Sequence, residues 1–191
     1  MRAIDLSLAI LLVTASSASP AQPGDPAALI RVEREAMERL SWMNGRWQGP
    51  AWSQTPAGRH EIVQTERIGP MLDGSVKVVE GKSFERDGRP AAFNAFGIIY
   101  FDPGKKVYRL HSHAQGRSGD FPMEVTADGY VWTIAAGPVS IRYAAIVRDG
   151  VWREVGEMVR PDGNATQIFE MNLRRTGDSD WPLAGQATVP H

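Results

Sequence analysis

The chain has 191 residues, of which 42% are hydrophobic and 23% charged, an ordinary globular composition with enough material for one domain and one core. A formal net charge of -1, with Lys and Arg spread along the chain, predicts no nucleic-acid partner and no polybasic membrane patch. The sequence holds no Cys, which excludes disulfides, thiolate chemistry and lipid attachment to an N-terminal Cys.

Residues 1–21 have the pattern of a secretory signal peptide. Arg2 precedes an apolar run at residues 6–13, and a segment rich in Ala and Ser follows it up to Ala21. The apolar run is too short to span a bilayer, and small residues before Ala21 suit signal cleavage. We therefore predict an exported protein, periplasmic or secreted, with no membrane span in the mature chain. The alternative is an N-terminal tail that is disordered or amphipathic.

One amphipathic helix is predicted after a short linker at residues 22–26. Asp25 is a favourable N-cap and Pro26 a favourable first helical residue. From residue 27 to residue 43, apolar side chains recur every three or four positions with charged ones between them. Asn44-Gly45 then predicts the helix stop. A lone helix before a run of strands is suited to plugging an open end of a barrel.

The chain after Gly45 reads as about ten short strands joined mostly by hairpins. Turn signals such as Asp128-Gly129 and Asp149-Gly150 separate them, because Asp-Gly adopts the positive φ of tight turns at low cost. The predicted strands cover residues 46–53, 59–68, 75–85, 92–102, 107–113, 121–127, 130–135, 139–148, 151–159 and 165–174. We predict an all-β, about ten-stranded antiparallel up-and-down barrel with one N-terminal α-helix. The domain is expected at residues 27–175 and a disordered tail at residues 176–191.

The stretch Gly45-Arg46-Trp47-Gln48-Gly49 resembles the Gly-x-Trp-x-Gly opening of lipocalin-like proteins, including the nitrobindins. Together with Glu66 and residues 69–74, 96–102 and 169–174, it is similar to a bacterial lipocalin-like family of unknown function, over residues 40–175. The resemblance implies a calycin-type barrel whose interior takes a small hydrophobic molecule, and it implies no known reaction. The nitrobindin branch also implies a b-type haem held by a His in the last strand. Because residues 165–175 contain no His, no haem or other cofactor is expected.

His111 and His113 form a His-x-His pair on a predicted strand, where alternation places both rings on one face. Such a pair can ligate a metal, but no Glu follows within a few residues and the other histidines are His60 and the terminal His191. We therefore predict no metal site. The pair either lines the cavity or its rim, or lies with Arg109 on the outer, solvated face.

Arg142, Tyr143 and Glu154 lie on two neighbouring predicted strands and would form a charged cluster if they faced inward. Small barrels that bind carboxylates commonly hold them with a buried Arg, whose guanidinium presents a bidentate fork. The alternative is that Arg142 points outward and pairs with a Glu of the neighbouring strand, because the face that carries Tyr143 is the more apolar one.

Aromatic side chains supply the remaining cavity candidates, and they either line a ligand site or are plain core. The full set of predicted cavity residues is Trp47, Phe96, His111, His113, Trp132, Arg142, Tyr143, Trp152, Glu154 and Phe169.

Nucleophile motifs are missing from the sequence. Ser112 points away from both neighbouring histidines, no Gly-x-Ser-x-Gly elbow occurs, and Gly116-Arg117-Ser118-Gly119 reads as a loop turn. We assign no catalytic residue and predict an exported binding protein for a small hydrophobic or amphipathic molecule, as a monomer or homodimer. One alternative is a barrel enzyme, an isomerase or hydrolase, that uses lumenal His or Glu as acid or base. The other is an envelope interaction protein whose barrel is filled by its own side chains.

Overall fold

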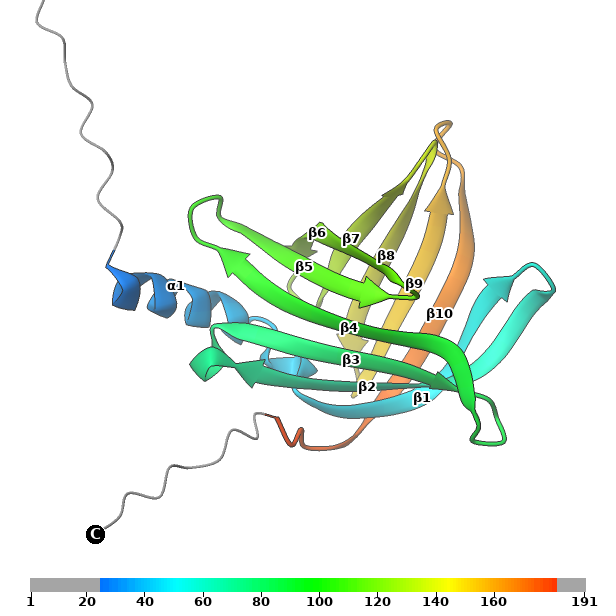
Figure 1. The fold of residues 1–191 in the computed structure, drawn as a ribbon, viewed down its shortest axis with the longest axis horizontal. Coiled ribbons are helices and arrows are strands. Elements are labelled where there is room, and N and C mark those ends of the chain that lie inside the picture. The colour runs from blue at the N-terminus through cyan, green and yellow to red at the C-terminus, as the bar shows by residue number, and fades with distance from the viewer. Residues whose placement is uncertain (1–24, 182–191) are drawn as a thin grey trace, which may run out of the picture.

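The structure is a computed structural model and describes residues 25–181 (Figure 1). The predicted signal segment at residues 1–21 and most of the predicted tail, residues 182–191, lie outside the described residues. The description begins at Asp25, immediately before the only α-helix of the described part, and ends at Trp181.

Helix α1 (Pro26–Glu38) begins where the sequence predicts. The Asp25 side chain accepts a hydrogen bond from the Ala27 amide at 3.1 Å, which satisfies one of the free N–H groups of the first turn. The helix ends at Glu38, earlier than predicted, and a 3₁₀ turn η1 (Ser41–Met43) follows it.

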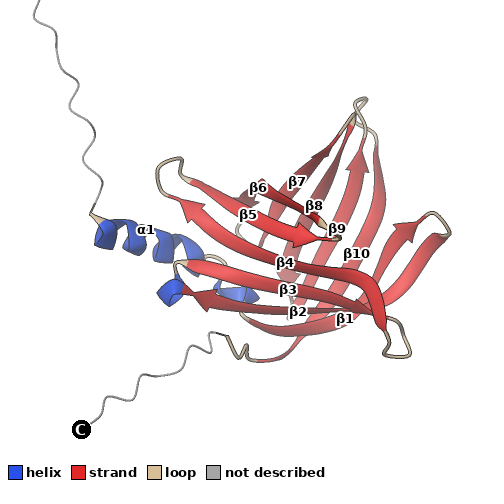
Figure 2. Ribbon diagram, in the orientation of Figure 1, coloured by secondary structure: helices blue, strands red, loops and turns tan. Residues whose placement is uncertain are grey.

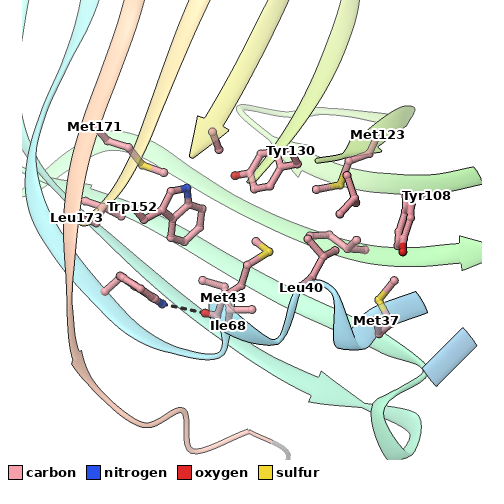
Figure 3. Packing of buried hydrophobic residues seen from close by; sticks show 14 of the residues in the cluster. Met37, Leu40, Met43, Ile68, Tyr108, Met123, Tyr130, Trp152, Met171 and Leu173 are labelled. Carbon is pink, nitrogen blue, oxygen red and sulfur yellow. Dashed lines mark hydrogen bonds between the residues drawn. The ribbon is translucent and has the colours of Figure 1, made fainter. Parts of the chain in front are cut away.

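The early end of α1 keeps three apolar side chains in one row. Met37, Leu40 and Met43 are spaced by three residues, and each is at most 2% exposed. A tighter turn with about three residues per turn keeps such a spacing on one line, whereas an α-helix would rotate it away. The three side chains point into one end of the sheet structure (Figure 3).

Ten strands follow, as predicted (Figures 1 and 2). They are β1 (Gly45–Thr55), β2 (Gly58–Met71), β3 (Val76–Phe84), β4 (Pro90–Asp102), β5 (Val107–Ala114), β6 (Arg117–Val125), β7 (Gly129–Ala136), β8 (Val139–Arg148), β9 (Val151–Val159) and β10 (Ala165–Gly177), with a 3₁₀ turn η2 (Leu72–Gly74) between β2 and β3. Each strand pairs antiparallel with its neighbours, and β1 pairs with both β2 and β10. The predicted all-β antiparallel barrel with one N-terminal helix is therefore confirmed, and its closure satisfies both edges.

Several strand boundaries differ from the prediction, and the differences at the β5–β6 hairpin and at the end of β10 also change loop and domain assignments. Gln115 and Gly116, with φ of 54° and 72°, form a two-residue hairpin turn, so β6 begins at Arg117 and the predicted loop at residues 116–119 is mostly strand. β10 runs to Gly177 beyond the expected domain boundary, and Asp180 pairs with Arg67 of β2 at 3.1 Å.

The core lies at the end of the barrel where α1 enters, called here the helix end. The Trp47 indole donates to the Met43 carbonyl at 2.8 Å, drawn dashed in Figure 3, and its ring meets the Trp152 ring edge-on at 5.7 Å. Tyr108 donates to the Ala36 carbonyl at 2.9 Å, which ties the helix to β5. These contacts hold the helix segment in one end of the barrel, which is the plug that the sequence predicts. No helix within residues 25–181 has the length and apolar character to cross a membrane.

The opposite end, where five hairpins turn, has no such plug within the described chain and is called here the open end (Figure 1). Strands β6 and β7 are joined by only three residue pairs, from Met123↔Trp132 to Val125↔Tyr130, all near the helix end. Their halves nearer the open end are not paired with each other. The wall is therefore least continuous between β6 and β7.

Candidate functional site

The ten predicted cavity residues fall on both faces of the barrel wall. Strand alternation and pairing with buried neighbours such as Ala51, Ala145 and Met171 identify the inward face. Six of the ten have the inward position: Trp47, Trp132, Tyr143, Trp152, Glu154 and Phe169. The other four, Phe96, His111, His113 and Arg142, point outward and do not line the lumen.

The histidine pair lies on the outer face of β5, the second of the two placements that the sequence left open. Leu110 and Ser112 take the inward positions between them, and the Nε2 atoms of His111 and His113 are 3.2 Å apart. Phe96 on the neighbouring β4 is 41% exposed on the same outer side. Within residues 25–181 no group of three His, Cys, Asp or Glu side chains is placed to hold a metal ion.

Arg142 also lies outside, because the more apolar face of β8 turns inward. Its guanidinium pairs with Glu157 of β9 at 2.6 Å, which is the surface ion pair offered as the alternative. Such exposed pairs contribute little to stability. A carboxylate ligand held by Arg142 in the lumen is therefore ruled out by its position.

Four inward-facing rings form what we call the aromatic wall: Phe121, Trp132, Tyr143 and Phe169. Trp132 and Tyr143 stack with centroids 4.5 Å apart and planes 12° apart. Phe121 meets Trp132 at 5.4 Å, and Phe169 meets Tyr143 at 6.1 Å. All four are only half-buried although they face inward. Because the barrel is closed, their accessible surface faces the lumen, towards the open end or the break between β6 and β7.

A glycine makes room for the wall. Gly156 of β9 is paired with Tyr143, and a Cβ placed there would lie 2.8 Å from Cε1 of Tyr143 and 3.0 Å from Cβ of Phe169. A methyl group at this position would clash with the tyrosine ring. Gly156 therefore lets Tyr143 lie against β9 and stack on Trp132.

Two carboxyl groups lie deeper in the lumen, and we call Glu66 and Glu154 the acidic floor. Glu154 of β9 is 7% exposed and accepts a hydrogen bond from the Tyr130 hydroxyl of β7. Glu66 of β2 accepts a hydrogen bond from the Gln64 amide at 2.8 Å. It faces Gly81 of β3, where a Cβ would lie 2.7 Å from the carboxylate. Glu66 keeps part of its surface accessible in mid-barrel, so that surface borders the lumen.

Burial shifts the protonation of the acidic floor. It raises the pKa of Glu66 from 4.5 to about 8, and the nearby Glu154 charge adds to the rise. Burial also raises the pKa of Glu154 to about 7, against the lowering effect of the Tyr130 hydrogen bond. The pKa of Tyr143 rises to about 12 through burial and the Glu154 charge. Both carboxyl groups therefore titrate near neutral pH, as acid–base and ligand-binding groups often do.

Two polar atoms beside the floor have no hydrogen-bond partner within the described chain. They are Oε1 of Gln64 and Nε1 of Trp152, an acceptor and a donor, both buried. A buried polar group without a partner costs free energy, so each favours a ligand or water that completes its hydrogen bond.

The sequence prediction missed Glu66, Gln64 and Tyr130 as site residues. A usable signal was present in β2, where Ile62, Gln64, Glu66 and Ile68 share one face. An amide and an acid between two isoleucines at alternate positions indicate polar groups on a buried face. Glu66 was noted only as part of a family resemblance.

Two surface depressions at the open end are separate from the floor. One, of about 450 Å³, follows the β5–β6 hairpin and includes His113 and Arg117. The other, of about 460 Å³, lies between the β1–β2 and β3–β4 hairpins, where His60 contacts Glu85 at 3.0 Å. Neither includes a residue of the aromatic wall or the acidic floor.

Comparison with known proteins identifies a fold and no family. No protein-family model matches the sequence, and no curated protein matches it. Among solved structures, Rv2717c from M. tuberculosis is similar at 15% identity with a TM-score of 0.56, covering 74% of this chain and 97% of that one. The S-type phycobiliprotein lyase CPES from Guillardia theta is similar at 12% identity with a TM-score of 0.50, covering 82% and 100%. The chain thus shares a calycin-like ten-strand barrel fold with both proteins.

Proposed function

We propose that the protein binds a small amphipathic molecule in the barrel lumen. The apolar body of the ligand lies against the aromatic wall, and its polar end reaches the acidic floor. One observation carries this proposal: Trp132, Tyr143 and Phe169 face into a closed barrel and yet keep accessible surface. Ligand sites in barrels are typically apolar with a few polar groups placed to orient the ligand.

The contrast between the two ends of the lumen argues against a barrel filled by its own side chains. At the helix end Trp152, Leu173 and Met43 are at most 1% exposed. Towards the open end the rings of the aromatic wall are half-buried, although Ile62 and Gln64 of β2 stay buried, and Glu66 borders accessible space. A filled barrel would bury the inward side chains along its whole length.

Export remains part of the proposal. The signal-like segment at residues 1–21 supports it, and the absence of Cys is compatible with an oxidising compartment because no thiol needs protection. Expression of the full chain in a bacterial host, followed by N-terminal sequencing of protein from the periplasm and the medium, tests this part. A mature N-terminus near residue 22 is expected; an intact Met1 in the cytoplasm would contradict it.

Native mass spectrometry of the purified protein, beside the denatured sample with its released small molecules identified, tests the binding function. We expect a stoichiometric organic ligand. The Tyr143→Ala variant should lose it, and Tyr100→Phe, on the outer face of β4, should keep it. If the wild-type mass is that of the bare polypeptide, exposure to a library of amphipathic molecules should restore a bound species, and failure there would refute lumen binding.

A second candidate function rests on the Tyr130–Glu154 pair. Glu154 faces inward, has a hydroxyl partner and carries a pKa raised to about 7 by burial, which suits a general acid or base. The outer position of His111 and His113 removes them from this role. Once a ligand is identified, its chemical conversion should be measured with wild type and Glu154→Gln. Turnover that is lost in the variant supports an enzyme; a ligand recovered unchanged from both supports binding alone.

A further inference from the structure

We propose that the polar end of the ligand is a protonated amine, held between Glu66 and Glu154. This inference rests on the proposed lumen binding and specifies the ligand's charge. The two carboxyl groups come from β2 and β9, face the same lumen, and are close enough for the charge of one to act on the other. A site that contains two acids and no base favours a cation.

The cationic side chains with inward positions lie at the two ends of the described barrel, where each is either hydrogen-bonded to another residue or exposed. At the helix end, Lys77 donates to the Asn44 side chain at 2.8 Å and Arg175 to the Asn44 carbonyl at 3.2 Å. At the open end, His60 contacts Glu85 at 3.0 Å and Arg117 is exposed. None of the four contributes to the pKa of either floor carboxyl. The acidic floor therefore has no positive partner within residues 25–181.

The aromatic wall suits the same ligand. The faces of Trp and Tyr rings attract a cation within about 6 Å of the ring centre, most strongly where water is excluded. Tyr143 of β8 lies one strand from Glu154 of β9, and Trp132 of β7 lies two strands from it. An ammonium group at the floor thus combines ion pairing with a cation–π contact, whereas a carboxylate ligand would meet two acids and electron-rich ring faces.

Amine binding is expected to release protons. Below pH 7 both floor carboxyls are largely protonated, because burial raises the pKa of Glu66 to about 8 and that of Glu154 to about 7. Hydrogen bonds from Tyr130 and Trp132 lower the pKa of Glu154, and one from Gln64 lowers that of Glu66. The charge of Glu80, on the outer face of β3, raises the pKa of Glu66, and the charge of Glu154 acts in turn on Tyr143. An ammonium ligand favours the ionised forms, so a carboxyl proton leaves to solvent on binding. Affinity should rise with pH by at most about tenfold per unit for each carboxyl that ionises on binding. It should level off above about pH 8, where both carboxyls are already ionised in the free protein, and fall above the pKa of the amine.

Calorimetric titration with matched probes tests the charge of the ligand. Naphthalen-2-ylmethylamine, naphthalen-2-ylmethanol and 2-naphthoate share one aromatic body, and dodecylamine, dodecanol and dodecanoate share one alkyl body. At about pH 8.5 we expect the amine of each set to bind at least about tenfold tighter than the alcohol, and the carboxylate to bind weakest. The ratio of amine to alcohol affinity should fall at about pH 6.

Variants assign the preference to the floor. Glu66→Gln/Glu154→Gln keeps the shape and one acceptor oxygen on each side chain, and it should remove the amine preference while the alcohols still bind. Glu61→Gln and Glu157→Gln, outward-facing acids on the same two strands, should change nothing. The wild-type comparison between probes and pH values decides the question even if the double variant does not fold.

The outcomes separate the two proposals. If the alcohols bind and Tyr143→Ala abolishes that binding, but the amines bind no tighter or the carboxylates bind tightest, the amine inference is overturned and lumen binding stands. If no probe of either set binds, or binding is unaffected by Tyr143→Ala, lumen binding itself fails and the amine inference with it.

Discussion

Tyr130 of β7 donates a hydrogen bond to Glu154 of β9 across the intervening strand β8. The pair is possible because Ala145, which is paired with both residues, carries only a methyl group between them. The hydrogen bond therefore links β7 to β9 across β8. Tyr130 lies beside the buried indole of Trp152, as Figure 3 shows.

Removing the Tyr130 hydroxyl should raise the pKa of Glu154 further, because that hydrogen bond lowers it at present. Tyr130→Phe is expected to reduce the free energy of unfolding by about 1 to 3 kcal/mol. NMR titration of the Glu154 carboxyl carbon measures the pKa, and urea unfolding measures the loss of stability. Tyr100→Phe, which removes an exposed hydroxyl beside Asp120, is the matched control and should change stability by less than about 0.5 kcal/mol. A Glu154 pKa that stays unchanged in Tyr130→Phe would contradict the assigned hydrogen bond.

The acidic floor predicts that the unliganded protein loses stability as pH rises from about 5 to 8. Burial raises the folded-state pKa of Glu66 to about 8 and of Glu154 to about 7, above the value of 4.5 in the unfolded chain. The contribution of the two carboxyl groups to stability is fully present below pH 4.5 and is lost as pH rises through their folded-state pKa values. Each pKa unit corresponds to about 1.4 kcal/mol, so the loss should reach several kcal/mol.

Urea unfolding at a series of pH values across this window checks the sign. Two other shifted groups change stability outside this pH window. Lys77 does so above it, because burial lowers its pKa to about 8, and Glu170 below it, because hydrogen bonds with Arg153, Gln167 and Asn172 lower its pKa to about 2. Glu66→Gln should flatten the decline. A wild-type stability that is constant or rises from pH 5 to 8 would show that these carboxyls are ionised in the folded protein.

The stability of the barrel should depend on Leu40 far more than on Leu29 of the same segment. Leu40 is 0% exposed in the row with Met37 and Met43, whereas Leu29 of α1 is 42% exposed. Leu40→Ala is expected to cost about 2 to 5 kcal/mol of unfolding free energy because it leaves a cavity in the core. Leu29→Ala should cost less than about 0.5 kcal/mol. Equal costs in thermal or urea unfolding would mean that the helix does not plug the barrel.

His111 and His113 should be dispensable for lumen binding. Both rings lie on the outer face of β5, and their positions are separated from the lumen by the sheet itself. The double variant His111→Ala/His113→Ala should bind the lumen ligand with wild-type affinity in calorimetry, while Trp132→Ala should weaken it. Loss of binding in the histidine variant alone would place the site outside the barrel.

Local sequence signals were sufficient for most of the architecture. The Asp25-Pro26 start of the helix and the turns that separate ten strands act over a few residues, so they can be predicted without knowing the fold. Alternation likewise separated Arg142 from Tyr143, because one face of β8 is visibly more apolar than the other.

The candidate site depended on contacts that no local pattern contains. The helix was predicted to continue to Met43, yet it ends at Glu38, where packing of Leu40 and Met43 into the barrel favours a tighter turn. On β5 the His pair had two placements of similar merit, and only pairing with β4 showed that Leu110 and Ser112 face inward.

By itself, the sequence determined that the chain makes one helix and ten hairpin-linked strands, because capping, turns and alternation are short-range preferences. Only the tertiary structure decided which face of each strand is inside and that Glu66 and Glu154 face the same lumen. Closure of β1 onto β10 brings β2 and β9 around one lumen, and burial there changes the protonation of both acids. That burial depends on residues that are distant in the chain. Alternation along one strand distinguishes its two faces but does not determine which of them is buried.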